Sequence, residues 1–506
     1  MIDRRRFLAA GGLAAVATAA GAPAAAAASS GGRGRRPDWS ALRRTIDGEV
    51  LVPGDPAYED RYPTYLSRYD SIRPAAVVRP RRAGDVAEAV RFARRYGVRS
   101  VARSGGHSFG GFSTGTGMVV DFSSYARTTV SGGRAHLQAG AKMVDMQDAL
   151  NRQGLSITGG MCPTVGIGGL ALGGGFGMAG RRYGLASDRL TGIRIVLADG
   201  RLVRCDSRHD PDLFWALRGG GAGSFGVVTD FEFAPYPAGD TTVFQIFWPW
   251  SAAADVVAAW QEWGPAAPAD LTAGLYVRTF DPSMEPEVFA FGQWAGRPSD
   301  LDRVIGDLYA RVGHSPSTVD LRTVPYIDSV LYWGGCSGLS VSQCHAPGQT
   351  PDGGLWRLEH ALTKSDFFTR SLPREGIDAM LAAVVRDQPP GELRGLEFHA
   401  FGGAYNRPTP GTTAWVHRRQ KFLLQYLAQV GTGATVERKA AVDQWGRDIW
   451  ATMRPWASGE AYQNYSDPDL RDWRRAYYGD NYRRLVGVKR RYDPHTYFDF
   501  AHVIGR

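Results

Sequence analysis

Cysteine and lysine are both scarce in this chain, and each scarcity removes a class of protein. The four cysteines contain no C-x-x-C pair, so no zinc-binding pattern is present, and we predict no metal site. Only five of the 59 basic residues are lysine, and the arginines are spread along the chain, often beside Asp or Glu. The net charge of +9 therefore lacks the clustered basic face typical of nucleic-acid binding, which we do not expect.

Long apolar runs are also missing after the first 28 residues, so we expect no membrane span there. Hydrophobic residues make up 43% of the 506 and charged residues 22%, as in ordinary globular proteins. This length predicts two or three folding units with a large core.

Residues 1–28 have the pattern of an export signal. Arg4 and Arg5 open a basic start, an Ala-rich apolar run follows from Phe7, and small residues near position 28 suit a signal peptidase. The start R-R-R-F-L resembles a twin-arginine signal and indicates secretion through the twin-arginine translocation machinery. An ordinary Sec signal or an uncleaved anchor is the alternative. Residues 29–49 are expected to be a leader.

Secretion permits disulfide bonds, and this bears on the cysteines. Cys336 and Cys344 are eight residues apart and could pair, but the sequence leaves this open. Cys205 is expected to be a buried or edge-strand thiol.

The pattern of strands and helices that the sequence predicts changes near residue 237. Before it, short β-branched strands such as 76–78 and 227–233 alternate with helices, one of which we expect Asp85 to cap. Residues 238–459 combine aromatic-rich strands with helices, which predicts an antiparallel sheet backed by helices and an α+β fold. Residues 460–506 form a Tyr- and Arg-rich tail.

Two glycine motifs imitate a nicotinamide-binding site. Residues 221–226 match G-x-G-x-x-G, and residues 166–171 match its G-x-G-x-x-A variant. The first runs into the strand predicted over 227–233, although the mechanism needs a helix there, and neither has a correctly placed acidic residue. We therefore reject a Rossmann site, while expecting the backbone to approach a ligand at both loops.

Two other features of the glycine loops are chemically suggestive. Residues 103–111, R-S-G-G-H-S-F-G-G, offer consecutive amides and one arginine as a nest for a diphosphate. Residues 159–169, G-G-M-C-P-T-V-G-I-G-G, contain a single cysteine. Taken singly, His107 is more often a structural hydrogen-bonding residue and Cys162 a buried thiol.

Together with Y-G-L-A-S-D at 183–188 and Y-G-D-N-Y at 478–482, these loops resemble the berberine-bridge-enzyme-like flavoproteins. That family has the vanillyl-alcohol oxidase, or PCMH-type, FAD-binding fold. The resemblance implies an FAD-binding domain of two α/β subdomains over 50–237, a substrate domain over 238–459, and a C-terminal segment, 460–506, that returns to the FAD domain.

The resemblance also implies the cofactor and its attachment. FAD would be bound covalently to His107 through an 8α-histidyl bond and to Cys162 through a 6-S-cysteinyl bond. The other expected cofactor-binding residues are Arg103, Ser104, Gly105, Gly106, Ser108, Val165, Gly166, Gly168, Gly169, Gly173, Val228 and Asn481.

The segment Y-Q-N-Y at 462–465 matches the family's Y-x-N-Y element, and the resemblance makes Tyr465 the catalytic proton acceptor. A free phenol has a pKa of about 10, so we expect a neighbouring donor or positive charge to lower it. Strand alternation puts Glu397 and His399 on one face, and His399 is the second catalytic candidate. Gln425 stands where some members have an acidic base, and as an amide it is expected to orient substrate. Ordinary sheet packing is the alternative for both.

The implied reaction is the oxidation of a small-molecule alcohol to a carbonyl by hydride transfer to FAD. Val165 resembles the family's oxidases, so molecular oxygen is the expected acceptor, giving hydrogen peroxide. The Trp- and Tyr-rich substrate domain suits sugar rings and flat polyketides equally. We favour a tailoring enzyme of antibiotic biosynthesis. An oligosaccharide oxidase that forms a lactone and a flavin dehydrogenase with another acceptor are the alternatives.

Overall fold

The computed structural model describes residues 36–431 and 433–506. The expected signal peptide and the first part of the leader lie outside these residues. Within them, no helix combines the length and apolar character needed to cross a membrane. Helices and sheets are mixed throughout the described chain, which confirms the predicted α+β fold class.

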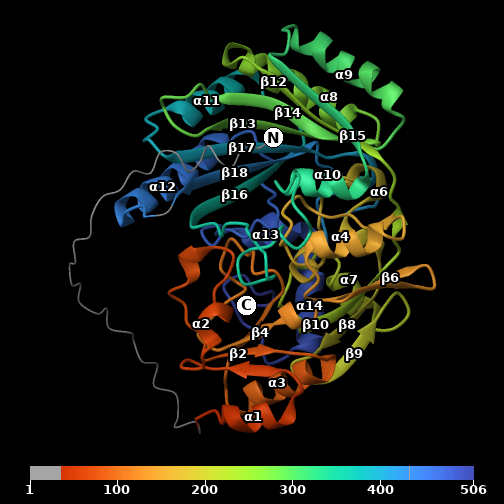
Figure 1. The fold of residues 1–506 in the computed structure, drawn as a ribbon, viewed down its shortest axis with the longest axis vertical. Helices are drawn as coiled ribbons and strands as arrows, with labels where there is room; N and C mark the ends of the chain where they lie inside the picture. Colours follow the sequence, from red (N-terminus) through yellow and green to blue (C-terminus); the bar gives the residue numbers. More distant parts are fainter. Residues whose placement is uncertain (1–35, 432) are drawn as a thin grey trace.

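The N-terminal unit is built on two larger sheets (Figure 1), beside a small one that pairs β7 (Leu155–Ser156) with β11 (Tyr236–Pro237). The first has the order β1 (Glu49–Leu51), β2 (Ala76–Arg79), β4 (Met118–Asp121), β3 (Ser100–Arg103), and its last three strands are parallel. The second is antiparallel, in the order β5 (Thr128–Ser131), β6 (Arg134–Gln138), β10 (Val227–Phe233), β8 (Leu190–Val196), β9 (Leu202–Cys205). Helices accompany them, among them α2 (Tyr58–Arg61), α3 (Ala83–Arg95), α4 (Met143–Asn151), α5 (Ile167–Leu172), α6 (Gly180–Tyr183) and α7 (Pro211–Ala216).

Two expectations for this unit need correction. Helix α1 (Trp39–Thr45) buries Leu42 in the core of the N-terminal unit, so the folded part begins inside the segment expected to be a leader. Asp85 is not the N-cap of α3 but its third residue, and its carboxylate accepts hydrogen bonds from the backbone N–H groups of Arg81 and Arg82. The carboxylate thus caps the helix from inside its first turn.

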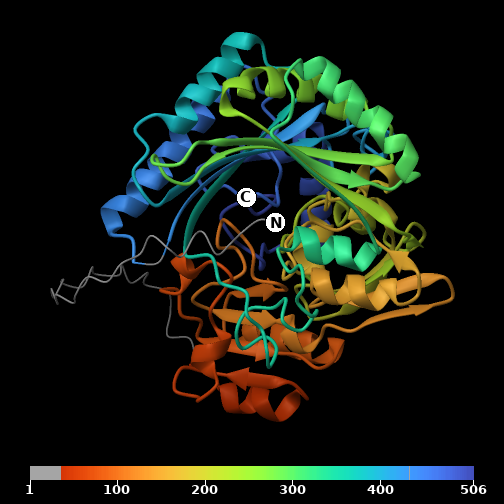
Figure 2. The same cartoon turned by 45° about the horizontal axis from the view of Figure 1, so that its top comes forward.

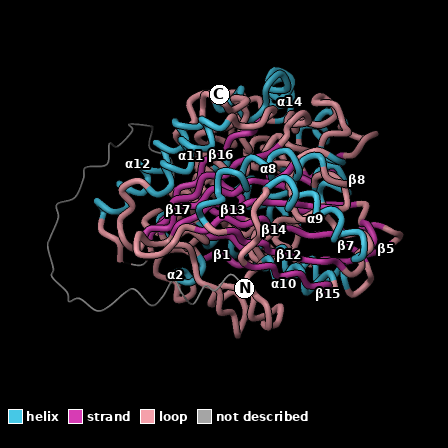
Figure 3. Tube along the Cα trace, turned by 90° about the horizontal axis from the view of Figure 1, so that it is seen from above, coloured by secondary structure: helices cyan, strands magenta, loops and turns pink. Residues whose placement is uncertain are grey.

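The second unit is built on one seven-stranded antiparallel sheet. Its order is β15 (Thr318–Val324), β12 (Thr241–Trp248), β14 (Glu287–Trp294), β13 (Leu271–Thr279), β17 (Glu392–Ala400), β18 (Phe422–Val430), β16 (His360–Phe368). Helices α8 (Ala253–Ala266), α9 (Pro298–Val312), α11 (Arg374–Val385) and α12 (Val436–Met453) lie over its outer face (Figures 2 and 3).

Side-chain alternation divides this sheet into two faces. Leu275, Leu396 and Leu424 pack with the helices in an apolar core. The other face carries polar side chains and is turned toward the N-terminal unit (Figure 2). The sheet therefore forms the roof of a space between the two units.

The C-terminal segment returns to the N-terminal unit. Helix α13 (Trp473–Tyr478) contributes Tyr477, and helix α14 (Tyr482–Tyr492) contributes Leu485 and Val488, to the same core cluster as Met118. The Lys489 ammonium is buried and donates to the Asp493 carboxylate over 2.6 Å. The last residues are thus part of the first unit's interior.

Two cysteine questions are answered by the structure. Cys336 and Cys344, in the loop after α10 (Tyr326–Trp333), form a disulfide. Cys205 is buried on the edge strand β9, and burial raises the pKa of its thiol to about 12.

Candidate active site

One large cavity, about 1680 Å³, lies between the polar face of the sheet and the N-terminal unit. Its walls include both glycine loops, strands β13, β17 and β18, and residues 462–466. Sites for a single small molecule usually measure about 300–1,000 Å³. The cavity is therefore large enough for a large cofactor together with a substrate.

The first glycine loop packs directly against the second. A Cβ atom at Gly105 would lie 2.4 Å from the backbone nitrogen of Gly166 and from the carbonyl oxygen of Thr164, so only glycine fits. The Ser104 hydroxyl donates to the Ala139 carbonyl over 2.5 Å. This packing presents the tip of the loop to the cavity.

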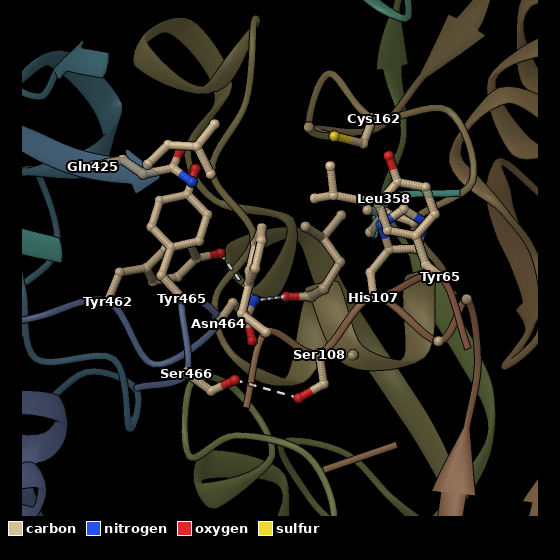
Figure 4. Close-up of a pocket in the computed structure, with 18 of the residues that line it drawn as sticks. Tyr65, His107, Ser108, Cys162, Leu358, Gln425, Tyr462, Asn464, Tyr465 and Ser466 are labelled. Atoms are coloured by element: carbon tan, nitrogen blue, oxygen red, sulfur yellow. Dashed lines mark hydrogen bonds between the residues drawn. The ribbon is translucent and has the colours of Figure 1, made fainter. Parts of the chain in front are cut away.

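His107 stands at that tip in a defined orientation. Its Nε2 atom lies 2.8 Å from the Thr164 hydroxyl, and its ring stacks on Tyr65 with centroids 3.9 Å apart (Figure 4). Burial, helped by the charge of Lys142, lowers the pKa of His107 to about 3. The imidazole is therefore neutral at physiological pH, and a neutral ring nitrogen is nucleophilic.

Cys162 and Val165 lie on the second glycine loop, immediately before α5. Cys162 is exposed, and its sulfur points into the space above His107 (Figure 4). Val165 lines the same cavity, and Gly166 caps α5. One cavity thus contains the histidine and the cysteine that the sequence singled out.

Tyr465 enters the cavity between two anchored neighbours (Figure 4). The Asn464 amide donates to the Leu170 carbonyl over 3.0 Å and to the Tyr462 hydroxyl over 2.9 Å. The Ser466 hydroxyl accepts from the Gly110 N–H over 2.9 Å and lies 3.3 Å from the Ser108 hydroxyl. The residue before Tyr465 is therefore tied to α5, directly after the second glycine loop, and the residue after it to the first glycine loop.

The pKa of Tyr465 does not move as expected. Burial first, and then the charge of Glu397, raise it well above 10. The expected lowering is therefore not produced by the described side chains, because a low-polarity site beside a carboxylate favours the protonated phenol.

His399 and Gln425 lie on the sheet wall of the cavity, as strand alternation predicted for His399. The Gln425 amide donates to the Thr363 hydroxyl over 3.0 Å. Glu397 pairs in register with Tyr276 on β13 and with Gln425 on β18, so three polar side chains cross the wall in one row.

Three of the expected cofactor residues do not line the cavity. Arg103 is buried in an ion pair with Asp121, 2.6 Å away, and donates to backbone carbonyls such as that of Tyr62. Gly173 lies under Asn464, and Asn481 donates to the Pro410 carbonyl. The expected residues that do line it are Ser104, Gly105, Gly106, His107, Ser108, Cys162, Val165, Gly166, Gly168, Gly169 and Val228.

The sequence did not reveal Thr164, Tyr65, Asn464 and Ser466 as parts of the site. Each acts through a contact with a residue distant in the sequence, such as Ser466 with Ser108. The Y-x-N-Y element contained a signal for Asn464, but nothing in it named the partner.

Comparison with known proteins gives this geometry a family. Residues 74–206 match the family described as FAD binding domain, and residues 461–505 match the one described as Berberine and berberine like. The chain is 30% identical over 445 residues to a chitooligosaccharide oxidase of Gibberella zeae, covering 84% of this chain and 86% of that protein. The chain belongs to the berberine-bridge-enzyme-like FAD-linked oxidases.

Other family members agree. An uncharacterized FAD-linked oxidoreductase of Bacillus subtilis, YgaK, is 29% identical over 91% of this chain and 97% of its own length. The solved structure of Physcomitrella patens BBE-like 1 superposes with a TM-score of 0.83 at 27% identity, over 92% of this chain and 98% of that chain. The resemblance stated from the sequence is confirmed, and the protein is an FAD-linked oxidoreductase of this family.

The cavity fits the cofactor that the family implies. The two glycine loops on its floor pack backbone to backbone at Gly105 and Gly166, where a Cβ atom would collide with the other loop. A Cβ atom at Gly169, which also lines the cavity, would meet nothing within 4 Å, so the floor leaves room there for a ligand. The size of the cavity exceeds that of a single small-molecule site. Among the described residues, no group of three or more His, Cys, Asp or Glu side chains is arranged to hold a metal ion.

Proposed function

We propose that the protein is a secreted oxidase that converts an alcohol, on a sugar or a secondary metabolite, into a carbonyl compound. The observation that supports this best is that three side chains line one cavity: His107, Cys162 and Tyr465. The identity to a protein named chitooligosaccharide oxidase supports a carbohydrate as substrate. When bound, FAD would accept hydride from the substrate carbon and pass the electrons to oxygen, forming hydrogen peroxide.

His107 and Cys162 would hold the cofactor at two points. A neutral His107 ring, oriented by Thr164 and Tyr65, is suited to forming a bond to carbon, and the exposed Cys162 is accessible for a second bond. Two tethers leave one face of a flat ligand open, which allows a bulky substrate to approach. Val165 on the second glycine loop supports oxygen, rather than another acceptor, as the oxidant.

Tyr465 is the proposed acceptor of the substrate hydroxyl proton. Its anchored neighbours fix the phenol between the two cofactor loops and the sheet wall. Because the described residues raise its pKa, the phenol begins with its own proton. It therefore orients the hydroxyl first. It can take up the substrate proton only if its own proton passes in the same step to another base on the cavity wall, for which the Glu397 carboxylate is the candidate.

The substitution Tyr465→Phe tests this proposal, because it removes only the phenol oxygen. Flavin reduction in a single turnover should slow about 10²–10⁴-fold, while flavin content and reoxidation by oxygen stay near wild type. Tyr462→Phe is the matched neighbour and should cost only a few-fold, since it removes one hydrogen bond from Asn464.

Two outcomes would change the assignment. A loss below about threefold in Tyr465→Phe would transfer the base role to His399. Less than one hydrogen peroxide per substrate oxidised would favour a dehydrogenase with a different acceptor.

A further inference from the structure

Two polar atoms on the sheet wall are buried without a hydrogen-bond partner among the described residues. They are Glu397 Oε1 and His399 Nε2. Both residues line the cavity, and each is only 8% exposed. The two atoms lie 3.2 Å apart, but they are not aligned for a hydrogen bond with each other. A buried polar atom without a partner is costly, so this arrangement indicates that a ligand completes it.

The backbone of the pair and the His399 ring are held in place by their neighbours. Strand β17, which carries both residues, is paired on both sides, by β13 and β18. The His399 ring packs against Phe176, with centroids 4.8 Å apart, and meets Phe291 edge-on at 6.4 Å. The wall therefore presents two preorganised polar atoms to the cavity.

The chemistry of the pair selects one kind of ligand group. A hydroxyl can donate a hydrogen bond to the Glu397 carboxylate and accept one from the His399 ring N–H at the same time. An ether oxygen can only accept, and a methylene group does neither. Phe176 contacts both the His399 ring, at 4.8 Å between centroids, and the Tyr465 ring, at 6.0 Å, so the pair lies near the tyrosine.

We propose that Glu397 and His399 together bind a second substrate hydroxyl, on the carbon next to the one that is oxidised. The proposal rests on the proposed function for the identity of the first hydroxyl. It assigns the substrate class as vicinal diols, the group common to sugars and polyhydroxylated metabolites, and it makes this pair determine specificity.

Binding without turnover tests the proposal. The purified, flavin-loaded protein is first reduced with dithionite, so that its flavin cannot take a hydride from the ligand. It is then titrated under nitrogen with trans-1,2-cyclohexanediol, 2-methoxycyclohexanol or cyclohexanol, and dissociation constants are measured by ligand-observed NMR. We expect the diol to bind at least roughly tenfold more tightly than cyclohexanol and several-fold more tightly than the methyl ether, because it makes two more hydrogen bonds than the first and one more than the second.

The variants locate the effect. Glu397→Leu and His399→Leu should reduce the preference to within about twofold, whereas Glu397→Gln, which keeps an acceptor oxygen, should retain most of it. Gln429→Leu removes a polar side chain from the same wall and should leave the preference unchanged. If the leucine variants do not fold, the wild-type comparison of diol with methyl ether and the Glu397→Gln variant decide the question.

The outcomes separate this proposal from the proposed function. Equal or absent binding of the three compounds overturns the diol site even if the protein proves to be an oxidase, and would mean that water satisfies the pair. A diol preference in a protein that oxidises no alcohol would support the binding site and refute the oxidase.

Discussion

The anchoring of Tyr465 can be tested by adding one methyl group at Gly173. This residue ends α5 with a φ of −98°, which alanine adopts without strain, so Gly173→Ala probes only the space above it. The new Cβ atom would lie 2.0 Å from Asn464 Oδ1 and 2.5 Å from its Cγ, closer than real Cβ contacts allow. The Asn464 amide must therefore move.

The expected magnitude follows from what Asn464 holds. Its amide makes two hydrogen bonds, to the Leu170 carbonyl and the Tyr462 hydroxyl. Losing both at about 0.5–1.5 kcal/mol each lowers the free energy of unfolding by about 1–3 kcal/mol. A displacement of Tyr465 by about 1 Å would slow flavin reduction by about 10²-fold, with flavin content retained.

Denaturant unfolding and single-turnover flavin reduction measure the two effects. Gly306→Ala in α9 is the control, because a Cβ there meets nothing within 4 Å, and it should raise stability by about 0.5–1 kcal/mol. Combining Gly173→Ala with Asn464→Ala should cost less than the sum of the single changes, since the smaller side chain makes room. Strict additivity, or a Gly173→Ala protein like wild type in both assays, would refute the anchoring argument.

Three further predictions concern the cofactor, acid stability and export. Acid-precipitated protein should stay yellow, with peptide mapping placing flavin on His107 and Cys162. The His107→Ala protein should keep only the bond between flavin and Cys162. Loss of all flavin from the wild type on denaturation would contradict both covalent attachments. Burial, and then Arg474, lower the pKa of His502 from 6.5 to about 4, so the unfolded chain binds more protons in this range. The His502 contribution to the free energy of unfolding should be complete above pH 6.5 and be lost as the pH falls toward 4. The melting temperature of the wild type should therefore drop more over this range than that of His502→Asn, and an equal drop in both proteins would contradict the prediction. Replacing Arg4 and Arg5 by Lys should trap precursor in the cytoplasm, whereas normal export would indicate a Sec route.

The parts of the site that lie in continuous motifs could be predicted from the sequence. His107 and Cys162 sit in short loops whose residues act locally, and strand alternation sufficed to place Glu397 and His399 on one face. The anchors of Tyr465 could not be found in this way. Asn464 and Leu170 are 294 positions apart, and Ser466 and Ser108 are 358 apart, so only the folded chain brings them together.

Arg103 was predicted from its motif to bind the cofactor, and the fold gives it a different role. In the sequence it stands beside a glycine nest and suits a diphosphate. In the fold it ends β3 exactly opposite Asp121 at the end of the parallel strand β4, and the two buried charges neutralise each other. A charge at the end of one parallel strand must be weighed against the ends of its neighbours before it is assigned to a ligand.

The burial of the C-terminal segment affects the order in which the protein can be made. Phe498 and Ile504 complete the same core as Met118, which the ribosome adds nearly four hundred codons earlier. The first unit therefore cannot close until residue 504 has been synthesised, and Tyr465 is also added late. A stop codon just before residue 498 would remove part of the first unit's interior, so this truncation should yield an unfolded product rather than a slightly shortened enzyme.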